Sequence, residues 1–66
     1  MSITVNGDSH PWREDLTVEK LLQEKKYSFP LKIVYINKER IPKEDHRTKL
    51  IEDGDEVSVI HMMSGG

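Results

Sequence analysis

The sequence predicts an α+β fold in which a mixed β-sheet packs on one main helix. Three observations lead to this prediction. Residues 1–6 alternate between polar and apolar side chains and run into Asn6-Gly7, a pair typical of a tight β-hairpin. Residues 16–22 carry apolar side chains at helical spacing, and three further β-like segments follow them. A hairpin, a crossover helix and further strands can close around one small core.

The first strand is expected over residues 1–6, with Ile3 and Val5 on its buried face. The pair Asn6-Gly7 favours a type I′ turn, which needs positive φ at both of its central residues. Asp8 is expected to extend this turn. Residues 10–13 would then form the returning strand, which Pro11 restricts to an edge of the sheet or a strand start.

The main helix is expected to begin after Thr17, whose side chain can cap the first turn. Leu16 and Leu21 can pack together across this cap as a hydrophobic staple. The pattern decays at residues 25–26, and Pro30 prevents any continuation. The buried face of the helix is expected to comprise Val18, Leu21 and Leu22.

The most β-like segment is residues 32–37, which contains the uninterrupted apolar run 33–36. Such a run is typical of a strand that is covered on both faces, or on one face plus a neighbour. The chain is expected to turn at residues 37–39. Residues 40–42 would then form a short edge strand.

The last third of the chain returns to the core after a polar stretch. Residues 43–49 are expected to be irregular, with room for one helical turn. Asp53-Gly54-Asp55 is expected to form a turn, and the last strand is expected over residues 56–62. Alternation in that strand places Val57 and Val59 on one face and Ile60 on the other. The expected core comprises Ile3, Val5, Val18, Leu21, Leu22, Val34, Ile36, Leu50, Val57 and Val59, with Ile51 dipping inward beside Leu50.

Length and composition exclude several classes of protein. A chain of 66 residues forms one small domain without room for a large pocket, so enzyme chemistry of its own is not expected. It has no cysteine, which excludes disulfides, thiolate nucleophiles and zinc-thiolate sites. The net charge of −2, from 10 basic and 12 acidic residues, argues against nucleic-acid or membrane partners. The β-like pattern begins at Ile3, so no signal peptide is expected and a cytoplasmic location is predicted.

The chain ends in Ser64-Gly65-Gly66, directly after the last strand. Because glycine has no Cβ, such a tail can enter a narrow cleft and present a carboxylate with no side chain beside it. An ATP-using partner can adenylate this carboxylate, after which a sulfur or amine nucleophile displaces AMP. The alternative is a frayed or added terminus without a function.

The order and spacing of these segments resemble the ubiquitin-like sulfur carriers of the ThiS/MoaD family. The resemblance is closer to the thiamine-pathway ThiS carriers than to the molybdopterin-pathway MoaD carriers, and it covers nearly the whole chain. It implies a β-grasp fold, with a domain over residues 1–63 and a flexible tail over residues 64–66. The polar segment 43–49, Ser64 and the two nearby methionines depart from the usual family pattern. The matching pieces are Asn6-Gly7, Leu16-Thr17-Val18 with Leu21-Leu22, Val34-Tyr35-Ile36-Asn37, Ile41-Pro42, Leu50 to Asp55 and Gly65-Gly66.

The resemblance implies a protein co-substrate for thiamine biosynthesis rather than an enzyme. An E1-like (ThiF-like) adenylyltransferase would adenylate Gly66, which then becomes a thiocarboxylate with sulfur from a donor such as a cysteine desulfurase. A ThiG-like thiazole synthase would receive that sulfur for the forming ring, and Gly65 and Ser64 would form the thin tail. ATP and zinc belong to the activating enzyme, so no cofactor or metal is expected on this chain.

The expected partner surface is the sheet face away from the helix, near the tail. It comprises Ile60 and Met62, with Met63 leading into the tail. Methionine suits a surface that must repack against different partners, although these residues can instead complete the core. A basic stretch over residues 38–49, together with Lys25-Lys26, is interrupted by acids, and we expect a solvated face there rather than a partner patch.

Three other functions remain open at this stage. The chain can be a carrier, or small subunit, for molybdopterin synthesis. It can serve another sulfur pathway or modify proteins through an isopeptide bond at Gly66. It can also be a plain β-grasp interaction module whose terminal glycines are incidental. The three histidines are scattered without metal-ligand spacing, which argues against a metal site in each case.

Overall fold

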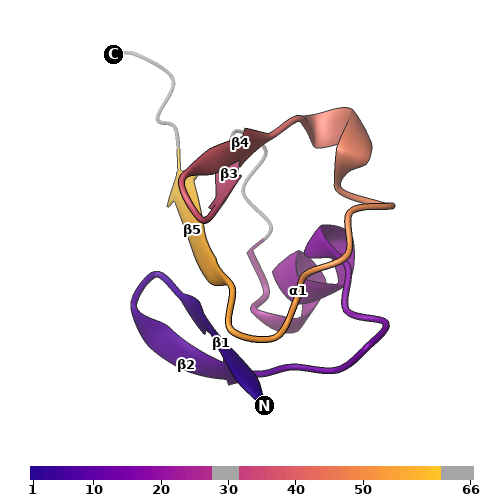
Figure 1. The fold of residues 1–66 in the computed structure, drawn as a ribbon. Helices are drawn as coiled ribbons and strands as arrows, with labels where there is room; N and C mark the ends of the chain where they lie inside the picture. Colours follow the sequence, from indigo (N-terminus) through magenta and orange to yellow (C-terminus); the bar gives the residue numbers. More distant parts are fainter. Residues whose placement is uncertain (28–31, 62–66) are drawn as a thin grey trace.

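A five-stranded mixed sheet lies against one helix in the structure, a computed structural model that describes residues 1–27 and 32–61 (Figure 1). The strand order is β2-β1-β5-β3-β4, with β1 parallel to β5 and all other neighbours antiparallel. The predicted α+β fold is therefore confirmed. The elements are β1 (Ser2–Val5), β2 (Asp8–Pro11), α1 (Val18–Glu24), β3 (Lys32–Ile36), β4 (Glu39–Ile41), the 3₁₀ helix η1 (Lys43–Asp45) and β5 (Glu56–His61).

The first hairpin turns at Asn6 and Gly7, whose φ angles are 52° and 87°. Both are positive, as a type I′ turn requires, which confirms the predicted turn. The expected start of the second strand at His10 was wrong, because Val5 already pairs with Asp8. A two-residue turn leaves no third residue in the loop, so β2 begins at Asp8. It is an edge strand, as Pro11 predicts.

Helix α1 begins and ends where the sequence pattern places it. The Oγ1 of Thr17 accepts a hydrogen bond from the N–H of Lys20 at 3.2 Å, so Thr17 caps the first turn. Leu16 and Leu21 are both completely buried, as a hydrophobic staple requires. At the other end the N–H of Tyr27 donates to the carbonyl of Leu22 at 2.9 Å, across Lys26 with a φ of 59°. This left-handed helix end is one that glycine usually occupies.

The second half of the sheet contains one correction to the expected core. Leu50 is 51% exposed, whereas its neighbour Ile51 is 1% exposed. The predicted burial of Leu50 was wrong because successive side chains of an extended segment point to opposite sides, and only one of the two can face the core. Leu50 bridges to Thr17, and the N–H of Ile51 donates to the carbonyl of Leu16 at 2.9 Å. The expected helical turn after β4 is confirmed as η1.

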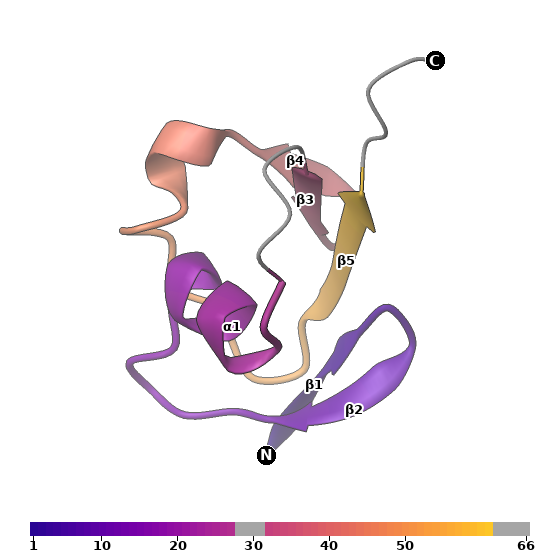
Figure 2. The ribbon, with the colours of Figure 1, turned by 180° about the vertical axis from the view of Figure 1, so that it is seen from behind.

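The core lies between α1 and the inner face of the sheet (Figure 2). Trp12 and Tyr27 pack against it from the side, and the Nε1–H of Trp12 donates to the carbonyl of Ile51 at 2.7 Å. The core comprises Ile3, Val5, Leu16, Val18, Leu21, Leu22, Val34, Ile36, Ile41, Ile51, Val57 and Val59. Strand β5 crosses the middle of this assembly and ends on the side of the molecule away from the N-terminus (Figures 1 and 2).

Candidate functional site

Strand β5 leads to the predicted tail, and it is held along both sides. Its β3 side forms an antiparallel ladder that runs from Ile36 opposite Val57 to Lys32 opposite His61. Its β1 side has a short parallel register that ends with Val5 opposite Val57. The described chain ends at His61, so Met62, Met63 and the predicted tail Ser64, Gly65 and Gly66 lie outside the described residues.

Asn6 continues the short parallel side of the ladder with its own side chain. Its backbone N–H donates to the carbonyl of Val57 at 2.9 Å. Its Oδ1 accepts the N–H of Val59 at 2.9 Å, and its Nδ2 donates to the carbonyl of Val59 at 3.3 Å. The side-chain amide thereby pairs with the backbone N–H and carbonyl of Val59, which a longer β1 would otherwise bind.

Asn37 holds the beginning of β5 from the opposite side. Its N–H donates to the carbonyl of Glu56 at 2.8 Å, and its Oδ1 accepts the N–H of Glu56 at 2.9 Å. Its Nδ2 donates to Asp55 Oδ1 at 2.9 Å. The other Asp55 oxygen accepts the N–H of Glu52 at 2.9 Å, which closes the preceding turn. Two asparagines thus fix the direction in which β5 leaves the domain.

An apolar patch lies on the face of the sheet away from α1. Ile60 is 47% exposed and pairs across the strands with Ile33, while Tyr35 lies one position further along the same face. Ile33 and Tyr35 are half-buried. We call Ile33, Tyr35 and Ile60 the outer apolar patch. Ile60 therefore has the exposure that a partner surface needs, although its role and those of Met62 and Met63 stay predictions.

Ile33 and Tyr35 were not predicted to belong to this patch. Their apolar run was interpreted as a strand covered on both faces, or on one face plus a neighbour. Only Val34 and Ile36 are buried, so the second alternative holds. The signal that identifies them is the alternation itself. Residues 33 and 35 alternate with the two buried positions, so their side chains point to the other face of the sheet. Ile60 lies on that same face.

The ionisable groups with shifted pKa lie away from this patch. Glu24 accepts hydrogen bonds from Arg13 and, at 3.1 Å, from His10, and the bond from Arg13 is the main reason that the pKa of Glu24 is lowered. Asp15 contacts Lys20 at 3.3 Å and Arg13 at 2.9 Å, and its pKa is lowered, mainly by the hydrogen bond from Lys20. This ion-pair cluster ties the segment after β2 to α1, which is a structural role.

Neither a metal centre nor a membrane span is present in the described part of the chain. His10 lies in β2, His46 follows η1 and His61 ends β5, and residues 1–27 and 32–61 contain no group of three or more metal-binding side chains that could hold an ion. Within the same ranges, no helix has the length and hydropathy needed to cross a bilayer.

Comparison with protein families finds one match over almost the whole chain. The model of the ThiS family matches residues 3–66, from within β1 at one end to the terminal glycines at the other. A comparison with curated proteins finds no match.

Two solved structures are similar to this chain over its full length. One is the crystal structure of the thiamine biosynthesis protein (ThiS) from Geobacter metallireducens, with 32% identity, a TM-score of 0.84, and coverage of 100% of both chains. The other is the NMR solution structure of a thiamine biosynthesis protein from Geobacter metallireducens. It has 30% identity and a TM-score of 0.73, and the match covers 100% of this chain and 88% of that one.

Proposed function

The chain belongs to the ThiS family, and from this we propose that it is a sulfur carrier of thiamine biosynthesis. Its mixed sheet on one helix is the β-grasp fold of that family. The thiamine pathway is favoured over molybdopterin synthesis because both similar structures are of thiamine biosynthesis proteins. The chain acts as a protein co-substrate, and catalysis belongs to its partners.

The carboxylate of Gly66 is the reacting group in this proposal. It attacks the α-phosphate of ATP on a ThiF-like adenylyltransferase, and pyrophosphate leaves as the acyl adenylate forms. A sulfur nucleophile then attacks the acyl carbon and AMP leaves. Sulfide gives the thiocarboxylate directly, whereas the persulfide of a donor such as a cysteine desulfurase gives an acyl disulfide, whose S–S bond a thiol reductant cleaves to release the thiocarboxylate. The thiocarboxylate passes its sulfur to a ThiG-like thiazole synthase. Gly65 and Ser64, which precede the reacting carbon, offer little steric hindrance because glycine has no side chain and that of serine is small.

The observation that carries this proposal is that the family match extends to Gly66, at the end of the segment that follows β5, a strand of fixed direction. Asn6 and Asn37 hold β5 from both sides, so the domain presents its chain end from one defined position. The outer apolar patch lies next to that position and is suited to contact the two partner enzymes in turn.

The test is a mass measurement of the full chain after incubation with a ThiF-like enzyme, ATP and a sulfur source. Replacement of one oxygen by sulfur at the C-terminus is the expected result. Deletion of Gly66 should abolish the mass change and leave the amide spectrum of residues 1–61 unaltered. Sulfur transfer to the shortened chain would refute the role of Gly66.

A second variant tests the outer apolar patch. Ile60→Asp should raise the KM of the activating enzyme for the carrier without unfolding the domain, because Ile60 is 47% exposed and outside the core. Thr4→Asp, at an exposed position on the same face but in β1, away from the patch, is the matched control. Unfolding of the Ile60 variant, or equal KM values for the two variants, would contradict a docking role.

A further inference from the structure

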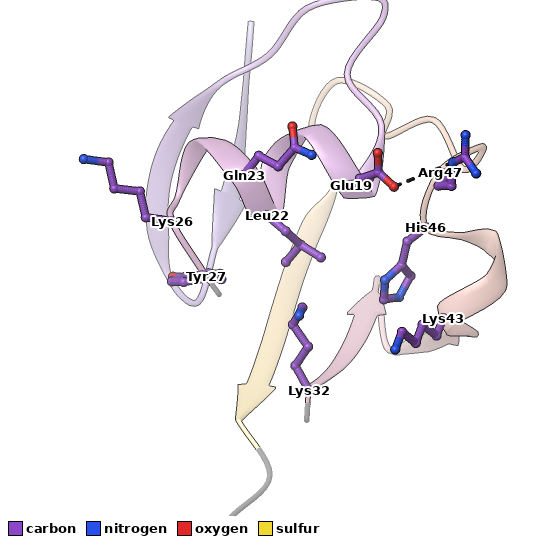
Figure 3. A pocket seen from close by; sticks show the side chains of 9 residues that line it. All are labelled: Glu19, Leu22, Gln23, Lys26, Tyr27, Lys32, Lys43, His46 and Arg47. Atoms are coloured by element: carbon purple, nitrogen blue, oxygen red, sulfur yellow. Dashed lines mark ion pairs between the residues drawn. The ribbon is translucent and has the colours of Figure 1, made fainter. Parts of the chain in front are cut away.

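A groove with a basic rim lies on the helix side of the sheet (Figure 3). By alternation along β3 and β5, this face is opposite to the one that carries the outer apolar patch. Its volume is about 630 Å³. Lys26 follows α1, Lys32 begins β3, and Lys43 and Arg47 come from η1 and the residues after it. We call the hollow that these four residues help to line the basic groove.

The charge of the basic groove differs from that of the rest of the chain. Its four cations are accompanied by one acid, Glu19, so its lining carries +3, whereas the whole chain carries −2. The remaining residues therefore carry −5, from −2 minus +3. Arg47 Nε lies 3.9 Å from Glu19 Oε2, which is a long ion pair.

Among the residues that the structure describes, two of these cations have no carboxylate partner. Arg13 and Lys20, elsewhere on the surface, each contact a carboxylate at 3.3 Å or less. By contrast, Lys26 and Lys43 form no ion pair with any residue in the described ranges 1–27 and 32–61. An unbalanced set of cations in one hollow attracts an anionic ligand.

The floor of the basic groove is apolar. Leu22 is 6% exposed, and Tyr27 is a partly buried side chain that packs against the core. His46 is 8% exposed, and its Nε2 lies 3.2 Å from the carbonyl oxygen of Ile41, which fixes the ring in place. A free phosphate would leave this floor uncovered. A peptide segment with carboxylates on both sides of an apolar side chain matches both the floor and the rim.

The basic groove also lies beside the end of β5. Lys32 pairs with His61, the residue after which the chain continues toward Gly66. An enzyme that holds the tail in its active site therefore reaches Lys32 as well. The groove and the outer apolar patch lie on opposite faces at this end of the sheet, so one enzyme can contact both.

We propose that the basic groove binds an acidic segment of the enzyme that adenylates Gly66, with one apolar side chain of that segment placed on Leu22 and Tyr27. This proposal rests on the proposed function. Contacts on both faces of the sheet would hold β5 in one orientation while its chain end reacts. They would also make the association rate of the two proteins depend on ionic strength.

The first test is an amide-shift titration of the full chain with a short peptide in which one leucine is flanked by aspartates and glutamates. The amides of Leu22, Tyr27, Lys32 and His46 should shift, and the shifts should weaken in high salt. The Asn/Gln version of the peptide should bind at least tenfold more weakly, because it lacks the charges.

Two matched double variants distinguish peptide binding in the basic groove from general electrostatic attraction to the chain. Lys26→Glu/Lys43→Glu should weaken peptide binding at least tenfold, whereas Lys38→Glu/Lys49→Glu should bind like the original chain. Both pairs change the net charge equally, and each includes one lysine with positive φ, Lys26 at 59° and Lys38 at 72°. Equal losses in the two variants would overturn the proposal, because they would indicate non-specific attraction.

Other occupants of the basic groove give different results. Shifts of the same amides with ATP but not with the peptide would show a phosphate site and overturn the proposal. The absence of shifts with either probe would overturn it too. Shifts of these amides on deletion of residues 64–66, without any added ligand, would show that the groove holds the chain's own end, and would likewise overturn the proposal.

An enzyme assay tests the identity of the partner. With a carrier that gains sulfur, Lys26→Glu/Lys43→Glu should raise the KM of the adenylating enzyme at least tenfold over the value for Lys38→Glu/Lys49→Glu. Equal KM values would overturn docking on that enzyme. If the original chain gains no sulfur at all, the proposed function fails, while the peptide titration still reports on the groove independently.

Discussion

The two hairpins that flank β5 have the same turn conformation but different residues at the second turn position. Asn6-Gly7 has φ angles of 52° and 87°, and Asn37-Lys38 has φ angles of 51° and 72°. In both, asparagine comes first and its side chain binds β5. Asparagine at the first position therefore has two roles, since it adopts a positive φ and its amide reaches β5. The second position needs only the positive φ.

The largest effect is expected at the first asparagine. Asn6→Ala removes both side-chain hydrogen bonds to Val59, which are partly buried, and leaves a donor and an acceptor of β5 without partners. We expect a loss of roughly 2–3 kcal/mol in the free energy of unfolding, measured by urea denaturation. The amide of Val59 should also exchange faster with solvent. A stability close to that of the original chain would show that the Asn6 side chain does not support β5.

A smaller loss is expected at the second asparagine. Asn37→Ala removes hydrogen bonds to Glu56 and Asp55 that are exposed, so water can replace them. The expected loss is about 1 kcal/mol in the same urea experiment. A loss equal to that of Asn6→Ala would mean that burial does not distinguish the two hairpins.

The second turn positions should respond in opposite directions. Gly7→Ala places a side chain at a φ of 87°, and no other atom lies within 4 Å of the added Cβ, so the cost is conformational and amounts to about 1 kcal/mol. Lys38→Gly relieves the same strain, less the entropy cost of glycine, and should stabilise the domain by about 0.5–1 kcal/mol. Thermal unfolding of both variants measures the difference. Destabilisation by Lys38→Gly would contradict this account.

The smallest effect concerns acid, and it acts through a carboxylate of α1 rather than through the side-chain amides of the two turn asparagines, which do not titrate. The pKa of Glu24 is lower in the folded chain than its ordinary value, mainly through Arg13. Its contribution to stability is therefore complete above the ordinary pKa and is lost as the pH falls through the lowered one. Glu24→Gln should therefore make the urea midpoint of unfolding depend less on pH between neutral and acidic conditions. An unchanged pH profile would show that this ion-pair cluster does not support the fold.

Local patterns predicted most of the fold, and the differences arise where long-range pairing decides. Alternation identified Ile3 and Val5, and helical spacing with Thr17 identified α1. The choice between Leu50 and Ile51 depends on the bridge to Thr17, which is distant in the sequence and leaves no local signal. Asn37-Lys38 lacks the glycine that usually marks a tight turn, so the turn was predicted without its conformation.

The candidate site was predictable in part for the same reason. Ile60 follows from alternation in one strand, whereas its neighbour Ile33 follows only from the pairing of β5 with β3. The cations of the basic groove are separated in the sequence by acidic residues, so the sequence predicted a solvated face there. The fold brings Lys26, Lys32 and Lys43 to one hollow and leaves the intervening acid Glu39 in β4, outside the groove.

The sole tryptophan of the chain is a built-in optical probe. Trp12 packs beside the core and donates its indole N–H to Ile51 at 2.7 Å, which joins the first hairpin to the segment before the last strand. Separation of these two segments on unfolding should shift its fluorescence emission to longer wavelength. Since Trp12 lies in neither the outer apolar patch nor the basic groove, loading or docking of the chain end should leave that emission unchanged. A single sample can therefore report the integrity of the domain independently of its chemical state.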